Sequence, residues 1–86
     1  MNQPKNENIN KCFKVVMKER FNNTTETFYT INKKQEYVHA QILNLIRAIH
    51  SNFDEMISIK EVDMKCFFQK GNKRVHYGFT NIVIKN

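Results

Sequence analysis

Hydrophobic and polar residues alternate along most of residues 56–85, and this pattern predicts a long β-hairpin. Gly71-Asn72 lies at its middle, and glycine at the first central position of a two-residue turn adopts positive φ without a Cβ clash. With the turn placed there, Phe68 lies opposite Val75. A slip of one residue would send every apolar side chain to the wrong face, so the agreement of both arms supports this pairing. The alternative is two shorter strands with an irregular joint.

A second hairpin is predicted earlier in the chain. Apolar residues occupy most odd positions of residues 12–21, with Lys14 and Lys18 between them, which is typical of a half-buried strand. The next strand, residues 25–31, follows a three-residue loop at 22–24 in which an asparagine takes the left-handed conformation. This loop length places Met17 opposite Tyr29.

One amphipathic helix is predicted between the two hairpins. Asn32 is expected to cap it through the side-chain oxygen, and the helix is expected to run from Lys33 to about Asn52. Its apolar stripe follows the 3.6-residue period and consists of Val38, Ile42, Leu45, Ile46, Ile49 and Phe53. The order ββαββ therefore predicts an α+β fold, with an antiparallel sheet of two hairpins packed on a single helix.

The length of 86 residues fits a flexible polar tail at residues 1–10 and one α+β domain at residues 11–86. Cys12 and Cys66 are too few for a disulfide scaffold, which predicts a reducing compartment. No apolar run approaches the ~20 residues that span a bilayer, and the start is not signal-like. We expect a cytoplasmic protein without a membrane partner, located in the host cytoplasm if a phage encodes it.

The formal net charge of +6 would attract nucleic-acid phosphates or an acidic partner protein. A compositional explanation competes with this interpretation. Lysines outnumber arginines by 11 to 3, and Asn and Ile are also frequent, as AT-rich codons would produce without selection for binding.

A basic cluster surrounds an aromatic residue at the tip of the predicted long hairpin. The candidate nucleic-acid-binding residues are Lys65, Phe67, Lys70, Lys73, Arg74 and His76. Basic side chains hold phosphates, and an aromatic ring stacks a base. Lys14, Lys18 and Arg20 on the first strand extend this surface. The alternative is that lysines on exposed strands prevent edge-to-edge aggregation.

The same hairpin carries an apolar face that one helix is too small to cover. Its candidate protein-interface residues are Met64, Phe68, Val75, Tyr77 and Phe79. Surplus apolar surface of this kind marks an interface with a partner protein or with a second copy in a homodimer. The alternative is that the first hairpin folds over this face and makes it ordinary core.

The sequence lacks a recognisable catalytic or metal-binding arrangement. No pair of its eight carboxylates has a forced geometry, neither cysteine has an adjacent histidine, and two glycines do not form a phosphate-binding loop. His39 and His50 would lie roughly 16 Å apart along one helix, too far for one ion. We therefore expect no enzyme activity, no metal and no cofactor.

These observations favour a non-catalytic protein-binding module for a partner with an acidic surface. The size, the lack of motifs and the AT-rich type of composition are similar to those of small phage and mobile-element proteins, including anti-defence inhibitors and regulators. The alternative function is a DNA- or RNA-binding module that uses the basic tip.

Overall fold

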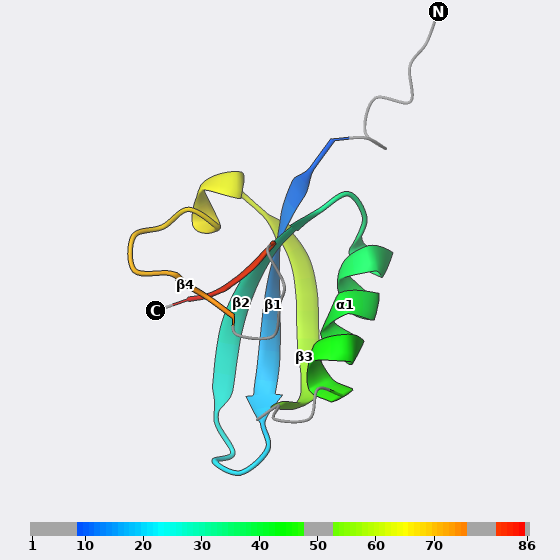
Figure 1. Cartoon of the computed structure of the whole chain (residues 1–86), viewed down its shortest axis with the longest axis vertical. Coiled ribbons are helices and arrows are strands. Elements are labelled where there is room, and N and C mark those ends of the chain that lie inside the picture. Colours follow the sequence, from blue (N-terminus) through cyan, green and yellow to red (C-terminus); the bar gives the residue numbers. More distant parts are fainter. Residues whose placement is uncertain (1–8, 48–52, 76–80, 86) are drawn as a thin grey trace, which may run out of the picture.

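The computed structural model describes residues 9–47, 53–75 and 81–85, and these form one antiparallel sheet with a single α-helix (Figure 1). The α+β fold is confirmed. In chain order the elements are β1 (Lys11–Glu19), β2 (Thr25–Asn32), α1 (Gln35–Arg47), β3 (Phe53–Val62), the 3-10 helix η1 (Met64–Cys66), β4 (Lys73–Arg74) and β5 (Ile82–Ile84). The strand order across the sheet is β3-β1-β2-β5-β4.

Strand β1 lies inside the sheet and has buried residues on both of its faces. Phe13, Val15 and Met17 point toward α1 and are almost fully buried. Cys12 is also buried, but it points to the opposite face of the sheet and belongs to a separate cluster. The predicted alternation is therefore correct, and the second face carries structure of its own.

The first hairpin forms with a register that differs from the predicted one. Met17 pairs with Glu26 and not with Tyr29. Strand β1 ends at Glu19 and β2 begins at Thr25, so the loop is longer than expected. The Glu19 N–H donates to the Thr24 carbonyl at 2.8 Å. The left-handed asparagine is confirmed at Asn23, with φ of 53°. Because Glu19 bonds to Thr24, the register continues with Glu19 opposite Thr24, and the four-residue loop 20–23 shifts every pair across the ladder.

The long hairpin predicted about Gly71-Asn72 is wrong. Strand β3 pairs with β1, so that Ile59 lies opposite Val15. Strand β4 pairs instead with β5, and Lys73 lies opposite Ile84. Both arms of the predicted hairpin contain strands, but each strand pairs with a different partner from the predicted one. The alternation of a strand determines the face on which a side chain lies, and it does not determine which strand pairs with it.

Residues 63–72, which we call the cover segment, interrupt the predicted first arm. The Asp63 carboxylate accepts a hydrogen bond from the Lys65 N–H at 2.9 Å and caps η1. Gly71 has φ of 95°, and the Asn72 N–H donates to the Gln69 carbonyl at 3.2 Å. The glycine therefore occupies the third position of a four-residue turn inside this segment.

Two irregularities in β3 explain the three-residue spacing of its inward residues. Phe53, Met56 and Ile59 all belong to the core beneath α1. Asp54 and Ile57 have no partner in the register against β1, so each is the extra residue of a β-bulge. Each bulge lengthens the spacing from two residues to three, so that Phe53, Met56 and Ile59 all point to the same face.

The helix buries part of the predicted stripe, but Phe53 was wrongly included, because it is the first residue of β3, and Ile49 lies outside the described residues. Val38, Ile42 and Leu45 have no exposed surface, and Ile46 packs against them. The predicted cap is wrong, because the Asn32 side chain accepts from the Lys33 N–H at 2.8 Å and the helix begins at Gln35. The predicted helix end at residues 48–52 and most of the predicted tail, residues 1–8, lie outside the described residues.

A side-chain amide network connects α1 with the strands. The Gln41 amide donates to the Asn81 side-chain oxygen at 3.0 Å, and the Asn32 amide donates to the Gln41 oxygen at 2.9 Å. The Asn81 amide in turn donates to the Ile31 carbonyl at 2.9 Å. This network fixes where the chain enters β5 relative to β2.

Candidate functional site

The face of the sheet opposite α1 carries a row of aligned side chains across all five strands. The strand register places Lys60, Lys14, Tyr29, Val83 and Arg74 side by side in this row. Lys60 and Lys14 are directly opposite each other, and like charges in that position are unfavourable. Tyr29 and Val83 are buried in the middle of the row, whereas Lys60 and Arg74 are exposed.

Further basic residues lie on the same face. Lys18 lies opposite Glu55, and their side chains form an ion pair at 4.0 Å. Strand alternation places Lys85 on the side of Val83. We call Lys14, Lys18, Lys60, Arg74 and Lys85 the basic face. Glu55 lies on the same side opposite Lys18, and alternation from the inward Phe53 places Asp54 there too.

The cover segment lies on the side of the sheet away from α1 (Figure 1), over the buried Tyr29 and Val83 in the middle of the row. Its Met64, Cys66 and Phe67 pack on the buried Cys12, Tyr29 and Val83. The Asn72 amide donates to the carbonyls of Cys66 and Phe67 at 2.9 and 3.1 Å, which holds the segment closed.

Phe68 is the exposed aromatic residue of the cover segment. Its side chain is 69% exposed, and its ring meets the Phe67 ring edge to face at a centroid distance of 5.0 Å. Phe67 is itself anchored in the cluster beneath the segment. The structure therefore holds an open aromatic ring on the side of the sheet that carries the basic face.

Burial beneath the cover segment changes the acidity of two groups. Desolvation raises the pKa of the Cys12 thiol to about 11 from its ordinary value of 9.0, with a smaller contribution from Cys66. Desolvation also raises the pKa of the Tyr29 hydroxyl. Both groups are neutral at pH 7, so they add no negative charge beneath the basic face.

The raised pKa of Cys12 predicts a loss of stability in alkali. The folded protein holds this proton more tightly than the unfolded chain, so the stabilisation is fully present below pH 9 and is lost as the pH rises through 11. The shift corresponds to at most about 3 kcal/mol. Urea unfolding at pH 8 and pH 11 should show a larger decrease for the natural chain than for Cys12→Ala, in which only the other groups titrate. Equal decreases would contradict this prediction.

The residues predicted as a protein interface do not share one surface in the described part of the chain. Val75 is buried in the core beneath α1, whereas Met64 packs in the cluster on the other face of the sheet. Phe68 is exposed beside that second cluster. Tyr77 and Phe79 lie outside the described residues.

The residues predicted as a basic tip are divided between the cover segment and β4. Lys65 and Lys70 are exposed on the cover segment, and Lys73 and Arg74 are exposed on β4. Phe67 is partly buried, and His76 lies outside the described residues. Only Arg74 of this set belongs to the basic face, together with the predicted Lys14 and Lys18.

Sequence reasoning missed Lys60 and Lys85 as members of the basic face. The face on which each side chain lies could be assigned only with the correct strand register. Arg20 was expected beside Lys14 and Lys18. Its guanidinium instead donates to the Phe53 carbonyl at 3.0 Å.

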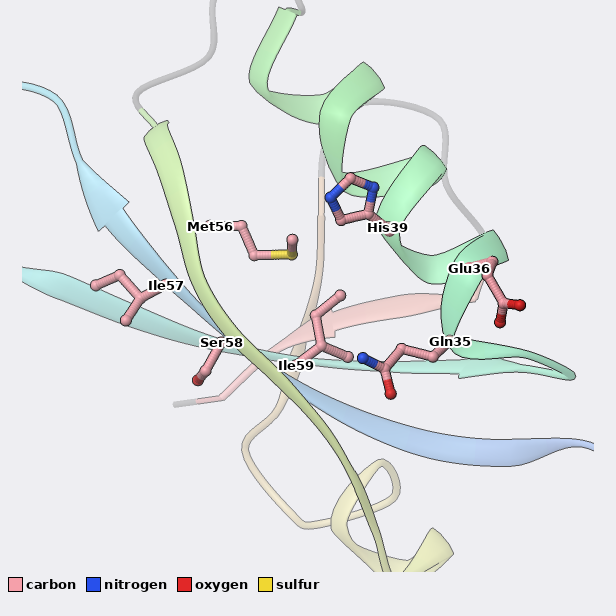
Figure 2. Close-up of a pocket in the computed structure, with 7 residues that line it drawn as sticks. All are labelled: Gln35, Glu36, His39, Met56, Ile57, Ser58 and Ile59. Atoms are coloured by element: carbon pink, nitrogen blue, oxygen red, sulfur yellow. The ribbon is translucent and has the colours of Figure 1, made fainter.

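A groove lies at the β3 edge of the sheet, between strand β3 and the first turns of helix α1 (Figure 2). It has a volume of about 460 Å³, and it is lined by Gln35, Glu36, His39, Met56, Ile57, Ser58 and Ile59. Met56 and Ile59 point toward α1, whereas Ile57 points away from it (Figure 2). Ile57 is 53% exposed.

The described residues contain no group of three or more His, Cys, Asp or Glu side chains that could hold a metal ion. In the same part of the chain, no helix has the length and apolar character needed to cross a membrane.

The chain matches no protein-family model, no curated protein and no solved structure. The geometry of the basic face is therefore the main guide to function.

Proposed function

We propose that this protein binds single-stranded nucleic acid through the basic face. The observation that carries the proposal is the segregation of charge, because the basic face brings five cations to one side of the sheet, where strand alternation places the carboxylates Asp54 and Glu55 beside them. AT-rich codons would explain the number of lysines, but they would not determine that these lysines share one face. A phosphate backbone would also relieve the repulsion between Lys14 and Lys60.

The exposed ring of Phe68 favours a nucleic acid over an acidic protein surface. Single-stranded nucleic acids bind through phosphate contacts and through stacking of unpaired bases on aromatic side chains. Phe68 offers such a ring on the cover segment, which packs on the same side of the sheet. Lys65 and Lys70 lie on this segment and add positive charge near the ring.

Fluorescence anisotropy with labelled single-stranded DNA, single-stranded RNA and duplex DNA tests the proposal. We expect affinity for the single strands to fall steeply as salt is raised, because bound phosphates release counterions. Lys14→Gln/Lys85→Gln should weaken binding about tenfold and lower the salt slope by about 1.4, the value for two lost phosphate contacts on a single strand. Phe68→Ala should weaken binding without changing the slope.

The matched control is Lys33→Gln/Lys34→Gln, which changes the net charge by the same amount. Both residues are exposed and precede α1, away from the basic face. This variant should bind within about twofold of the natural chain, because long-range attraction alone is largely screened at physiological salt. Equal losses for both double variants would refute a specific basic face, and no binding at low salt would refute the proposed function.

A further inference from the structure

We infer that β3 pairs with β3 of a second copy, which joins two sheets across a two-fold axis. Strand β3 is ten residues long and lies at an edge of the sheet. In the described part of the chain, no other strand pairs with its outer side. An unpaired strand of this length presents backbone N–H and C=O groups that a second chain can satisfy. This inference is independent of nucleic-acid binding.

The sequence of β3 is self-complementary when it runs antiparallel to itself. A two-fold axis between Ile57 and Ser58 places Glu55 opposite the second copy's Lys60 and Met56 opposite the second copy's Ile59. The symmetry repeats both pairs, so the contact holds two opposite-charge pairs and two apolar pairs. Such cross-strand pairs are the stabilising units of a sheet.

The bulge at Ile57 makes this pairing consistent with the two faces of the sheet. In a regular strand, residues 55 and 60 point to opposite faces, and so do residues 56 and 59. The extra residue restores agreement, because Met56 and Ile59 both point toward α1. Glu55 and Lys60 both point to the other face, opposite Lys18 and Lys14. With the bulge, the residues of each proposed pair point to the same face of the sheet. Bulges on edge strands also hinder pairing in other registers.

Apolar surface at this edge supports the same contact. Ile57 is 53% exposed at the centre of the proposed pairing, and Met56 and Ile59 line the open groove beside α1 (Figure 2). In the paired state, the second copy's Met56 and Ile59 would lie beside this groove on the α1 side. Pairing would thus bury apolar surface that one copy leaves in water.

The pairing would also place both basic faces on the same side of one continuous sheet. A two-fold axis that relates neighbouring antiparallel strands stands perpendicular to the sheet, so equivalent faces remain on one side. The second bulge, at Asp54, breaks the alternation before Glu55 and limits the regular pairing to residues 55–60.

Sedimentation velocity over roughly 1–500 µM tests the inference. The natural chain should shift from monomer to dimer. Lys60→Glu should weaken dimerisation at least about tenfold, because the new carboxylate would face the second copy's Glu55, and Glu55→Lys should act in the same way. The double variant Glu55→Lys/Lys60→Glu should restore dimerisation to within about threefold of the natural value, because it exchanges the partners of each pair.

Two controls separate this pairing from a general effect of charge. Lys34→Glu and Glu26→Lys change the net charge as the two single variants do, but Lys34 precedes α1 and Glu26 lies on β2, which β1 separates from β3. They should dimerise like the natural chain, and thermal unfolding should show that every variant folds. A natural chain that stays monomeric would overturn the inference. So would larger open assemblies, or a failure of the charge exchange to restore the dimer.

Discussion

Replacing Phe28 with alanine should lower the free energy of unfolding by about 3–5 kcal/mol. Phe28 has no exposed surface, and its ring meets Phe53 edge to face at a centroid distance of 5.0 Å. Phe28 lies on β2 and Phe53 on β3, so the two rings meet across β1, the strand between them. Removal of the ring leaves a cavity between these strands and α1.

The expected loss is a large fraction of the total stability. Domains are stable by about 5–15 kcal/mol, and one of this length belongs near the lower end. Thermal unfolding followed by circular dichroism should show a decrease in Tm of roughly 20 °C or complete unfolding. Phe21→Ala removes the same ring at a position that is 79% exposed and should change stability by less than about 0.5 kcal/mol. Similar losses in both variants would contradict the proposed core.

Replacing Thr30 with valine should stabilise the protein by about 1–2 kcal/mol. Thr30 is fully buried, and its side-chain oxygen has no hydrogen-bond partner within the described part of the structure. It lies between Phe13 and Ile82 in the sheet, where its neighbours are apolar. The natural chain therefore buries a hydroxyl group without compensation, and valine replaces that group with a methyl of similar shape.

Urea unfolding measures this effect when the natural chain is compared with Thr30→Val and Thr30→Ser. Serine keeps the unpaired hydroxyl and removes the packed methyl, so Thr30→Ser should be less stable than the natural chain. The order Val, Thr, Ser is expected. If valine proves destabilising, the hydroxyl has a partner, such as a buried water, and the packing argument fails.

The sequence predicted which residues are buried better than which strands are neighbours. The stripe of Val38, Ile42 and Leu45 and the inward residues of β1 are buried as their spacing predicted. A side chain's face follows from local periodicity, which is 3.6 residues in a helix and two in a strand. These features require no knowledge of the rest of the chain.

Strand partners could not be predicted in this way. Val15 has the same alternation whether it lies beside Ile59 or beside another apolar residue, and both pairings bury it. A hairpin between adjacent segments was the simplest solution for residues 56–85, but β3 gains a longer partner in β1. The capped turn that begins at Asp63 also ends the strand early, through a side-chain hydrogen bond that periodicity does not detect.

The sequence by itself determined the α+β composition, the amphipathic helix, the alternation of β1 and the excess of positive charge. The tertiary structure decided that Lys14 and Lys60 lie side by side, that the cover segment buries Cys12, and that β3 stands at an edge. The reason is physical: periodicity is set by the local backbone geometry, whereas the grouping of charges on a surface depends on strand register. That register is chosen by the packing of the whole sheet.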